Sequence, residues 1–546
     1  MRPITRLRRA PAVVAALAAT ALAAPFTAPP AAAAPSAAPG PVTPTQSGWV
    51  RGSVPDAAKV AAYRGIPYAA APVGGLRWKA PQPPKPWPGV RQATSFGDAC
   101  YGTQLPGPPV AMSEDCLSLN VWAPARGVPR AVLVWPAGAG FQTGSSAQPQ
   151  FDGAALAAEG VVVVTFNYRL GVFGHLARND LDKEAGSSGA YGLQDQIAAL
   201  RWVKNNIAAF GGDPSKVTLF GSSAGAHSVG MLMSSPQSRG LFSRAVAQSG
   251  AFWDSSHGSL PTHRQAVARG EALSDRLGAP SLAELRAVPA GELNDATAWN
   301  PLTDPLVTAF SPSVDGKVLT AAPAEIFRRG QQHDIPLLAG YNTAENFPLF
   351  DAQALPHDTP EAFHAAAERL FGAGRMARFK ELYPAADAGQ AARSASLLLS
   401  DMTISEQSWE LLNHHRRTAR SATYGYKFTY TSPYSPVAAH VAEIPFVLGN
   451  LHLPQYFAPT APPATTADRA FSAKVREYWV NFARRGDPNA TGLPAWPAYG
   501  GSGTALQELT AAPAPIADPD AARMEFLSSF RGPDGRFPDS WAAPAG

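Results

Sequence analysis

A serine set between glycines, in the run Gly221-Ser222-Ser223-Ala224-Gly225, has the spacing of a catalytic nucleophile. Residues 216–220 before it form a short apolar run typical of a buried strand, and residues 226–233 after it can continue as a helix. A strand, a Gly-x-Ser-x-Gly pentapeptide and a helix predict a tight turn that exposes the central hydroxyl near a helix N-terminus. A serine hydroxyl is a weak nucleophile at neutral pH and needs this exposure together with a base. We therefore predict Ser223 as the nucleophile, with glycines at 221 and 225 because a Cβ there would crowd the strand and the helix.

Apolar runs of strand length alternate with helical patterns along the chain. The candidate strands are residues 132–135, 161–168, 216–220, 245–248, 335–340 and 422–430. The clearest helix covers residues 193–210, where Ile197, Leu200, Val203 and Ile207 form one apolar stripe. This alternation predicts an α/β fold with a large, mostly parallel central sheet covered by helices on both faces. We expect the helix-rich stretches 262–290 and 360–420 to lie over the C-terminal edge of the sheet.

An acid and a histidine must complete a serine site of this kind, and they follow the nucleophile in the order acid, then histidine. Glu345 fits the acid because it lies in a short turn directly after the strand that ends near Gly340. His440 fits the base because it lies in a turn after the strand 422–430. The remaining histidines of this region are too close to the acid or precede the strand: His357, His364, His414 and His415. From position alone, Glu345 and His440 could also be ordinary solvated loop residues.

The first 33 residues have the composition of a secretory signal peptide. A basic start with four arginines is followed by an apolar region over residues 10–24 and by Ala31-Ala32-Ala33, which fits a cleavage site. A membrane anchor is the alternative, but the apolar run is short for a bilayer. Residues 34–46 are rich in Pro and Ala and are expected to be a linker, with residues 47–546 forming a single domain. We expect a secreted protein without a stable membrane anchor.

The charge and the histidine pattern exclude several classes of partner. The formal net charge is +4, and the four arginines of the signal account for all of it. The mature chain is formally neutral, which gives no reason to expect binding to nucleic acid. The eleven histidines form no His-Glu-x-x-His or Cys/His cluster, so no metal and no cofactor is expected. The adjacent His414 and His415 are expected on an exposed helix.

The chain has two cysteines, Cys100 and Cys116. An even pair this close in sequence predicts one disulfide in an exported protein. Closing such a loop would stabilise the fold by about 3 kcal/mol in the chain-entropy model. Two free thiols are the alternative.

Several short blocks between residues 48 and 500 follow one another in a recognisable order. They are Tyr63–Tyr68, Pro72–Arg77, Glu114–Val121, Asn167–Gly174, Tyr191–Gln196, Asn206–Pro214, Gln248–Gly250 and Tyr478–Pro488. In this order they resemble the type-B carboxylesterases, the family of the bacterial nitrobenzyl-esterase-like enzymes and the animal cholinesterases. The resemblance implies an α/β-hydrolase fold with helical insertions over the active site. It also implies a secreted serine carboxylesterase that hydrolyses a small-molecule ester through an acyl-enzyme.

The resemblance assigns roles to single residues. It implies Ser223 as nucleophile, Glu345 as acid and His440 as base, and it pairs Cys100 with Cys116. It implies further that Ser249 lies near the acid. Backbone N–H groups of Ala139, Gly140 and Ala224 would form the oxyanion hole.

The chain departs from the family around this site. Ala139 interrupts a glycine triplet, and its Cβ resists the positive φ that glycine adopts there. Ala137 stands where the family usually has His or Tyr, and Ser222 replaces an acidic residue. Asn346 and Val441 stand where glycine usually follows the acid and the base. The altered loop leaves open a catalytically weak or inactive binding protein. The same triad could also serve a hydrolase of amides, thioesters or lactones, which is a further alternative.

Overall fold

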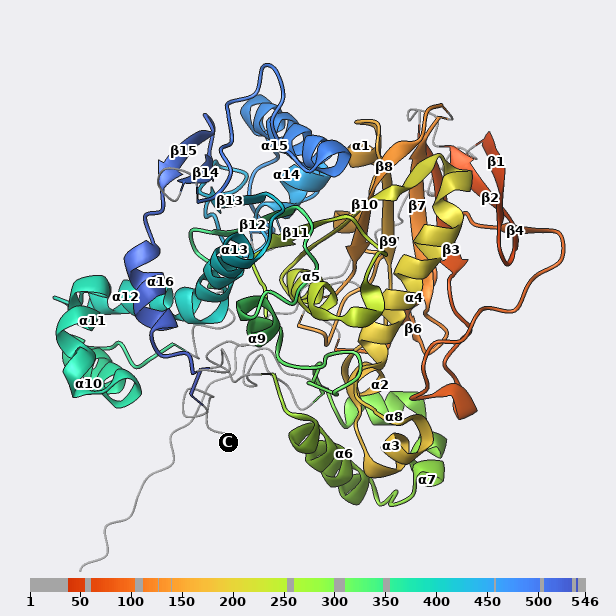
Figure 1. Ribbon diagram of the computed structural model, residues 1–546, viewed down its shortest axis with the longest axis horizontal. Helices are drawn as coiled ribbons and strands as arrows, with labels where there is room; N and C mark the ends of the chain where they lie inside the picture. The colour runs from red at the N-terminus through yellow and green to blue at the C-terminus, as the bar shows by residue number, and fades with distance from the viewer. Residues whose placement is uncertain are drawn as a thin grey trace, which may run out of the picture. The chain divides into compact units, whose positions relative to one another are not determined.

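Parallel strands form the centre of a large mixed sheet (Figure 1). In spatial order they are β9 (Val162–Phe166), β8 (Arg130–Pro136), β10 (Gly212–Ser222), β11 (Arg244–Gln248), β12 (Leu337–Asn342), β13 (Thr423–Phe428) and β14 (Ala505–Leu509). Each neighbouring pair in this series is parallel. All but β14 were predicted as continuous apolar runs, because strands covered on both faces need no alternation of polar residues. The predicted α/β fold with a mostly parallel sheet is confirmed.

The computed structural model describes most of the chain after residue 37. The described residues are 38–54, 60–103, 111–125, 127–138, 140–252, 260–298, 310–346, 354–455, 458–500, 505–532 and 537–538. The predicted signal peptide, residues 1–33, and Ala139 of the predicted oxyanion hole lie outside the described residues. Among the described residues, no helix is both long and apolar enough to cross a membrane.

Antiparallel strands extend the sheet at both edges. They are β1 (Ala38–Thr45), β2 (Gly48–Val54), β3 (Val60–Pro67) and β7 (Ser118–Pro124) on one side and β15 (Ala514–Ala517) on the other, with β4 (Val90–Gln92) joining β2. Residues 38–45 were predicted as part of a linker, and this prediction is wrong because they pair with β2. The buried Thr43 hydroxyl lies 2.7 Å from the hydroxyl of Tyr63. Proline is tolerated here because β1 is an edge strand, whose outer side needs no ladder hydrogen bonds.

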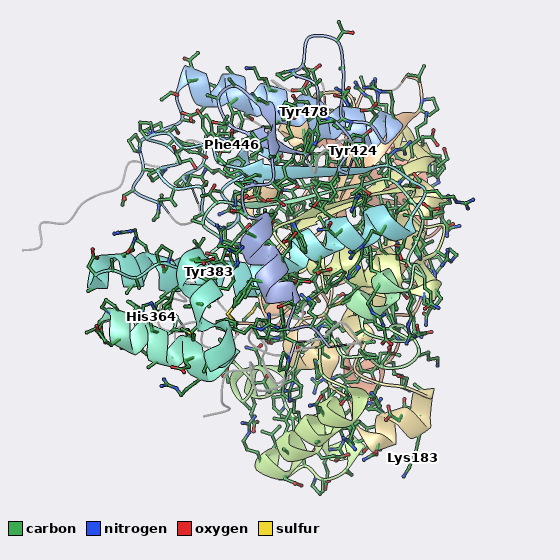
Figure 2. The ribbon with its side chains drawn as sticks, turned by 60° about the vertical axis from the view of Figure 1, so that its left-hand side comes forward. Lys183, His364, Tyr383, Tyr424, Phe446 and Tyr478 are labelled. Carbon is green, nitrogen blue, oxygen red and sulfur yellow. A yellow bond between two sulfur atoms is a disulfide. The ribbon has the colours of Figure 1, made fainter. Side chains whose placement is uncertain are left out.

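Helices cover both faces of the sheet, and alternate strand residues point to the two faces. Val132, Val134 and Leu219 belong to one core, together with side chains of α4 (Tyr191–Asn206), α5 (Ala224–Ser234) and α13 (Glu406–Thr418). Their neighbours Leu133, Trp135 and Phe220 belong to a second core under α1 (Ala154–Ala157), α14 (Ile444–Leu448) and α15 (Thr466–Arg485). Tyr424, Phe446 and Tyr478, labelled in Figure 2, come from β13, α14 and α15 and lie in this second core.

The predicted apolar stripe of the helix near residue 200 is buried in the first core. Its four residues are Ile197, Leu200, Val203 and Ile207. α4 ends at Asn206, and a 3₁₀ turn, η3 (Ile207–Phe210), replaces its predicted last turn. Gly211 follows with φ of 82°, a left-handed conformation that commonly ends a helix.

The two helix-rich stretches form separate groups. The first contains α6 (His263–Leu277), α7 (Leu282–Ala287) and α8 (Ala290–Asp295), near α2 (Gly171–His175) and α3 (Asn179–Ala185). The second contains α10 (Pro360–Phe371), α11 (Met376–Leu382) and α12 (Ala388–Ser400), which share a core with α16 (Ala521–Ser528). Tyr383 belongs to this core and is labelled in Figure 2 at the end of α11.

Two further predictions concern cysteine and histidine residues. Cys100, at the end of β5 (Ala99–Cys100) beside β6 (Met112–Ser113), forms the predicted disulfide with Cys116. His414 and His415 lie on α13 as predicted, but the expected exposure is wrong because both are buried. His414 Nε2 lies 2.8 Å from Glu410 Oε2, and His415 Nδ1 lies 2.8 Å from the hydroxyl of Thr423. Local periodicity does not reveal that α9 (Pro323–Arg328) and α16 pack against α13.

Candidate active site

Ser223 lies on the turn between β10 and α5, as the pentapeptide predicts. Its φ of 55° and ψ of −123° are unusual for a residue with a side chain, and such strain often marks a functional position. The Ser223 N–H donates to Gln248 O over 2.9 Å, which ties the turn to the end of β11. A Cβ on Gly221 would lie 2.6 Å from Gly225 C, so the strand and the helix cross too closely for any side chain there.

Glu345 and His440 meet through two neighbouring loops. Glu345 follows β12, and an isolated bridge between Ala344 and Ala439 holds its loop against the loop that carries His440. His440 Nδ1 donates to Glu345 Oε2 over 2.6 Å, and both side chains are at most 2% exposed. The other carboxylate oxygen, Oε1, accepts the N–H of Asn342 over 2.5 Å. With Nδ1 as the donor, Nε2 of the neutral ring is left as the basic nitrogen.

The three residues come from one edge of the sheet. β10, β11, β12 and β13 are parallel neighbours, so their carboxyl ends lie together. Ser223 follows β10, Glu345 follows β12, and His440 lies in the connection after β13. Ligand and catalytic residues of parallel sheets gather at this edge. The structure thus brings to one edge the three residues that chain order had selected.

Of the predicted oxyanion donors, Gly140 and Ala224 lie among the described residues. Ala224 is the first residue of α5, where N–H groups have no acceptor inside the helix. Gly140 follows β8 and has φ of 57°, which favours glycine. Ala137 is not a donor to substrate, because its N–H donates to Phe166 O over 3.1 Å. Ala224 thus has a backbone N–H next to Ser223, and the roles of Ala139, Gly140 and Ala224 as oxyanion donors stay a prediction.

The model of the carboxylesterase family matches residues 39–526. The chain belongs to this family. The fumonisin B1 esterase of Sphingopyxis macrogoltabida is 37% identical over 83% of this chain and 84% of that protein. The para-nitrobenzyl esterase of Bacillus subtilis is 34% identical over 84% of this chain and 92% of its own length. A solved carboxylesterase of Geobacillus stearothermophilus, 36% identical, superimposes with a TM-score of 0.74 over 89% of this chain and 99% of its own.

The chain is therefore a carboxylic ester hydrolase of the serine hydrolase class with the α/β-hydrolase fold. The resemblance seen in the sequence blocks is confirmed. Membership disfavours the binding-protein alternative, since these relatives are all named as esterases.

Glu443 is a buried acid of this carboxylesterase that the sequence reasoning missed. It is fully buried at the start of α14, three residues after His440. Its Oε1 accepts hydrogen bonds from Ser222 Oγ over 3.1 Å and from Gln248 Nε2 over 3.0 Å. Its Oε2 accepts from Asn342 Nδ2 over 2.7 Å. Burial raises the pKa of Glu443, and the negative charge of Glu345 raises it further.

This arrangement explains what Ser222 does in place of an acidic residue. Its hydroxyl supplies a hydrogen bond to Glu443, where a second carboxylate would repel it. Asn342 reaches both acids, through its N–H to Glu345 and its side-chain amide to Glu443. The only sequence signal for Glu443 was its place three residues after the base.

A second histidine lies beside the nucleophile. His227 is buried on α5, and its Nδ1 donates to Ser223 O over 2.6 Å. Burial lowers the pKa of His227 to about 3, so the ring is neutral at physiological pH. A Cβ on Gly250 would lie 2.8 Å from this ring, which leaves no room for a side chain at that position. His227 therefore supports the backbone of the turn.

Ser249, which the resemblance places near the acid, directly follows β11, and its nearness to Glu345 stays a prediction. Ser249 has φ of 55° and its N–H donates to Gly340 O over 2.8 Å. Its buried hydroxyl has no hydrogen-bond partner among the described residues.

Among the described residues, no group of three or more His, Cys, Asp and Glu side chains could hold a metal ion.

Proposed function

We propose that this carboxylesterase is exported and cleaves carboxylic esters through an acyl-enzyme on Ser223. The observation that carries the catalytic part is the buried hydrogen bond of 2.6 Å between His440 Nδ1 and Glu345 Oε2. It lies at the sheet edge at which the strained turn presents Ser223. A buried carboxylate that orients a histidine beside such a serine is the arrangement of a catalytic triad.

Acylation follows from these positions. His440 Nε2 takes the Ser223 proton as Oγ bonds to the ester carbonyl carbon, and Glu345 stabilises the imidazolium through the Nδ1 hydrogen bond. The carbonyl oxygen gains the negative charge near the N–H of Ala224 and the loop at Gly140. When the carbonyl re-forms, the C–O bond to the alcohol breaks, and Nε2 returns the proton to the leaving alcohol.

Deacylation repeats these steps with water as the nucleophile. His440 Nε2 removes a proton from water, whose oxygen bonds to the acyl carbon. The bond to Ser223 Oγ then breaks, and the serine takes the proton back. The products are the carboxylic acid, the alcohol and the regenerated enzyme. Each oxyanion donor removed would cost about 2.7–4 kcal/mol of transition-state stabilisation.

The relatives support the reaction class. Two are named for esters of different structure, fumonisin B1 and para-nitrobenzyl esters. A para-nitrobenzyl ester is therefore a suitable first substrate. Export is supported by the composition of residues 1–33 and by the disulfide, which is typical of oxidising compartments.

Covalent labelling tests the nucleophile. A fluorophosphonate probe should label the wild type, with loss of fluoride, and peptide mapping should find the adduct on Ser223. Ser223→Ala should lose both labelling and ester hydrolysis while melting near the wild type. Ser222→Ala is the matched control and should still be labelled. An adduct on Ser222, or hydrolysis by Ser223→Ala at the wild-type rate, would refute the assignment.

N-terminal mapping tests export. Expression of the whole chain in an exporting host should give enzyme in the medium that begins at Ala34. Enzyme retained inside the cell with residues 1–33 intact would contradict this part of the proposal and leave the catalytic part standing.

A further inference from the structure

A cavity of about 230 Å³ lies beside His440 and between the two loops of the candidate site. Ala344 and Asn346 of the acid loop line it, as do Ser435 and Val437 before the histidine. The lining includes both a surface side chain, Val437, which is 53% exposed, and the proposed base His440, which is 2% exposed. Pockets for whole ligands have about 300–1,000 Å³. A volume of this size can hold either the acyl part or the alcohol part of a small ester, but not both.

Neutral polar groups line this cavity. Ser435 is 1% exposed, and its Oγ has no hydrogen-bond partner among the described residues. An unpaired buried hydroxyl is unfavourable and is rare in native structures without a reason. A hydroxyl can both donate and accept, so a substrate hydroxyl entering the cavity would satisfy it.

The opposite wall also has hydrogen-bonding groups. Asn346 Nδ2 donates to Ser396 Oγ of α12 over 2.9 Å, and the Asn346 N–H donates to Ser400 Oγ over 2.8 Å. With its oxygen accepting, Ser396 keeps a hydroxyl proton to donate. Asn346 stands where the family usually has glycine, so the hydrogen-bonding side chain on this wall is a feature in which this chain differs from its family.

The rest of the lining is uncharged. Apart from His440, the described lining residues are Ala, Asn, Gln, Pro, Ser and Val. Alanine, proline and valine side chains can hold a short carbon chain, whereas a charged group would lose its hydration without gaining a partner. The cavity thus combines apolar contacts with unpaired neutral hydrogen-bonding capacity.

We infer that this cavity is a subsite for a short, uncharged, hydroxyl-bearing part of the ester, bound by Ser435 and Ser396. The inference rests on the proposed function, because it needs Ser223 to attack the carbonyl next to His440. A hydroxyl group on either the acyl or the alcohol side would offer the same chemistry to these serines.

Two matched pairs of esters test the subsite. Methyl 3-hydroxybutanoate with methyl butanoate varies the acyl side, and 2,3-dihydroxypropyl butanoate with propyl butanoate varies the alcohol side. The released acid is titrated at constant pH to obtain kcat/KM. In one pair the wild type should prefer the hydroxylated ester by roughly 3- to 10-fold, the size of one or two net hydrogen bonds. Monomethyl succinate, which places a carboxylate on the acyl side, should be a poor substrate.

Variants separate binding from folding. The preference ratio is kcat/KM for the hydroxylated ester divided by kcat/KM for its plain partner. Ser435→Ala should bring this ratio close to one. Ser396→Ala should lower the ratio without disturbing α12, since alanine favours helix. The control is Ser215→Ala, which replaces an exposed serine of β10 and should keep the wild-type ratio. A change in folding alone would lower kcat/KM for both esters of a pair by the same factor and leave the ratio of the two values unchanged.

The outcomes are distinct. Equal rates within both pairs, or a ratio unchanged in Ser435→Ala, would overturn the subsite while the proposed function stands. If the wild type hydrolysed none of these esters and no para-nitrobenzyl ester, the proposed function itself would fail, and the subsite with it.

Discussion

The hydroxyl of Ser222 donates a hydrogen bond to the buried carboxylate of Glu443, with 3.1 Å between Oγ and Oε1. Ser222 directly precedes the proposed nucleophile, and Glu443 follows the proposed base by three residues. The contact therefore ties the end of β10 to the start of α14. Through Asn342, the same carboxylate is linked to the loop of Glu345. One buried acid thus connects the three segments of the candidate site.

Glu443→Ala should destabilise the enzyme and lower kcat. It leaves three buried donors, on Ser222, Gln248 and Asn342, without their acceptor. An unsatisfied buried donor costs about 1–3 kcal/mol, so we expect a loss of at least about 2 kcal/mol. Ser222→Ala removes one donor and should cost about 1 kcal/mol. Thermal melting and ester hydrolysis measure both effects. Equal losses in the two variants would show that Glu443 matters only through Ser222.

The candidate triad could be predicted because two regularities act together. Parallel strands bring their carboxyl ends to one edge, and chain order then selects Glu345 and His440 among the other acids and histidines. Glu443 could not be found in this way, because its three partners come from β10, β11 and β12 and become neighbours only in the folded chain.

The failed predictions have a similar cause. Residues 38–45 have a linker composition, but the free edge of β2 offers them backbone partners. The exposure of His414 and His415 was judged from one helix, whereas the cover comes from α9 and α16, which lie far away in sequence. Composition and local periodicity carry no information about such contacts.

Removing the disulfide should lower stability without changing the chemistry. Cys100→Ser/Cys116→Ser opens a loop with a sequence separation of 16, worth about 3 kcal/mol in the chain-entropy model. The melting temperature should fall, while kcat per folded molecule for an activated ester should stay near the wild-type value. A large fall in kcat at a temperature where the variant is folded would place the loop in the active site instead.

Gly140→Ala should lower kcat strongly, whereas its effect on the unfolding free energy should be modest. Gly140 has φ of 57° and open space around the position of a Cβ, so the variant suffers backbone strain alone, about 1–2 kcal/mol. If the strain shifts an oxyanion donor, kcat should fall about tenfold for each 1.4 kcal/mol, with KM changed less. Gly278→Ala is the matched control, because Gly278 has φ of 61° and open space at the end of α6. The same fall in kcat in both variants would remove Gly140 from the oxyanion hole.

Asp520→Asn should loosen α16 from the sheet. Asp520 pairs with the buried Lys427 of β13 and accepts from Arg523 Nη2 over 2.6 Å. Removing one partner of a buried ion pair typically costs 3–5 kcal/mol. The unfolding free energy of this variant should therefore fall by roughly that amount, and its melting temperature should lie well below that of the wild type. Arg378→Gln, at an exposed pair with Glu381, is the control and should cost less than about 1 kcal/mol. Similar losses in both variants would mean that Lys427 is hydrated despite its burial.

Acid should destabilise this enzyme well above the range in which carboxylates titrate. Burial lowers the pKa of His175 and His227 to about 3 and that of His333 and His415 to about 4. A histidine in the unfolded chain has a pKa of about 6.5. Below that pH these four rings are protonated in the unfolded state but stay neutral in the folded state, so acid favours unfolding. The contribution of each ring is complete above about pH 6.5 and falls by about 1.4 kcal/mol per pH unit until its folded pKa is reached.

His333→Gln tests this pH dependence at one ring. His333 Nε2 donates to Ser235 O over 2.9 Å, and a glutamine amide can donate there without titrating. Between pH 7 and pH 5 the variant should lose about 2 kcal/mol less unfolding free energy than the wild type. His452→Gln, which changes an exposed ring, is the matched control. Urea unfolding at several pH values measures the difference. Parallel curves for His333→Gln and the wild type would mean that His333 takes up its proton in the folded enzyme, and that acid lability arises elsewhere.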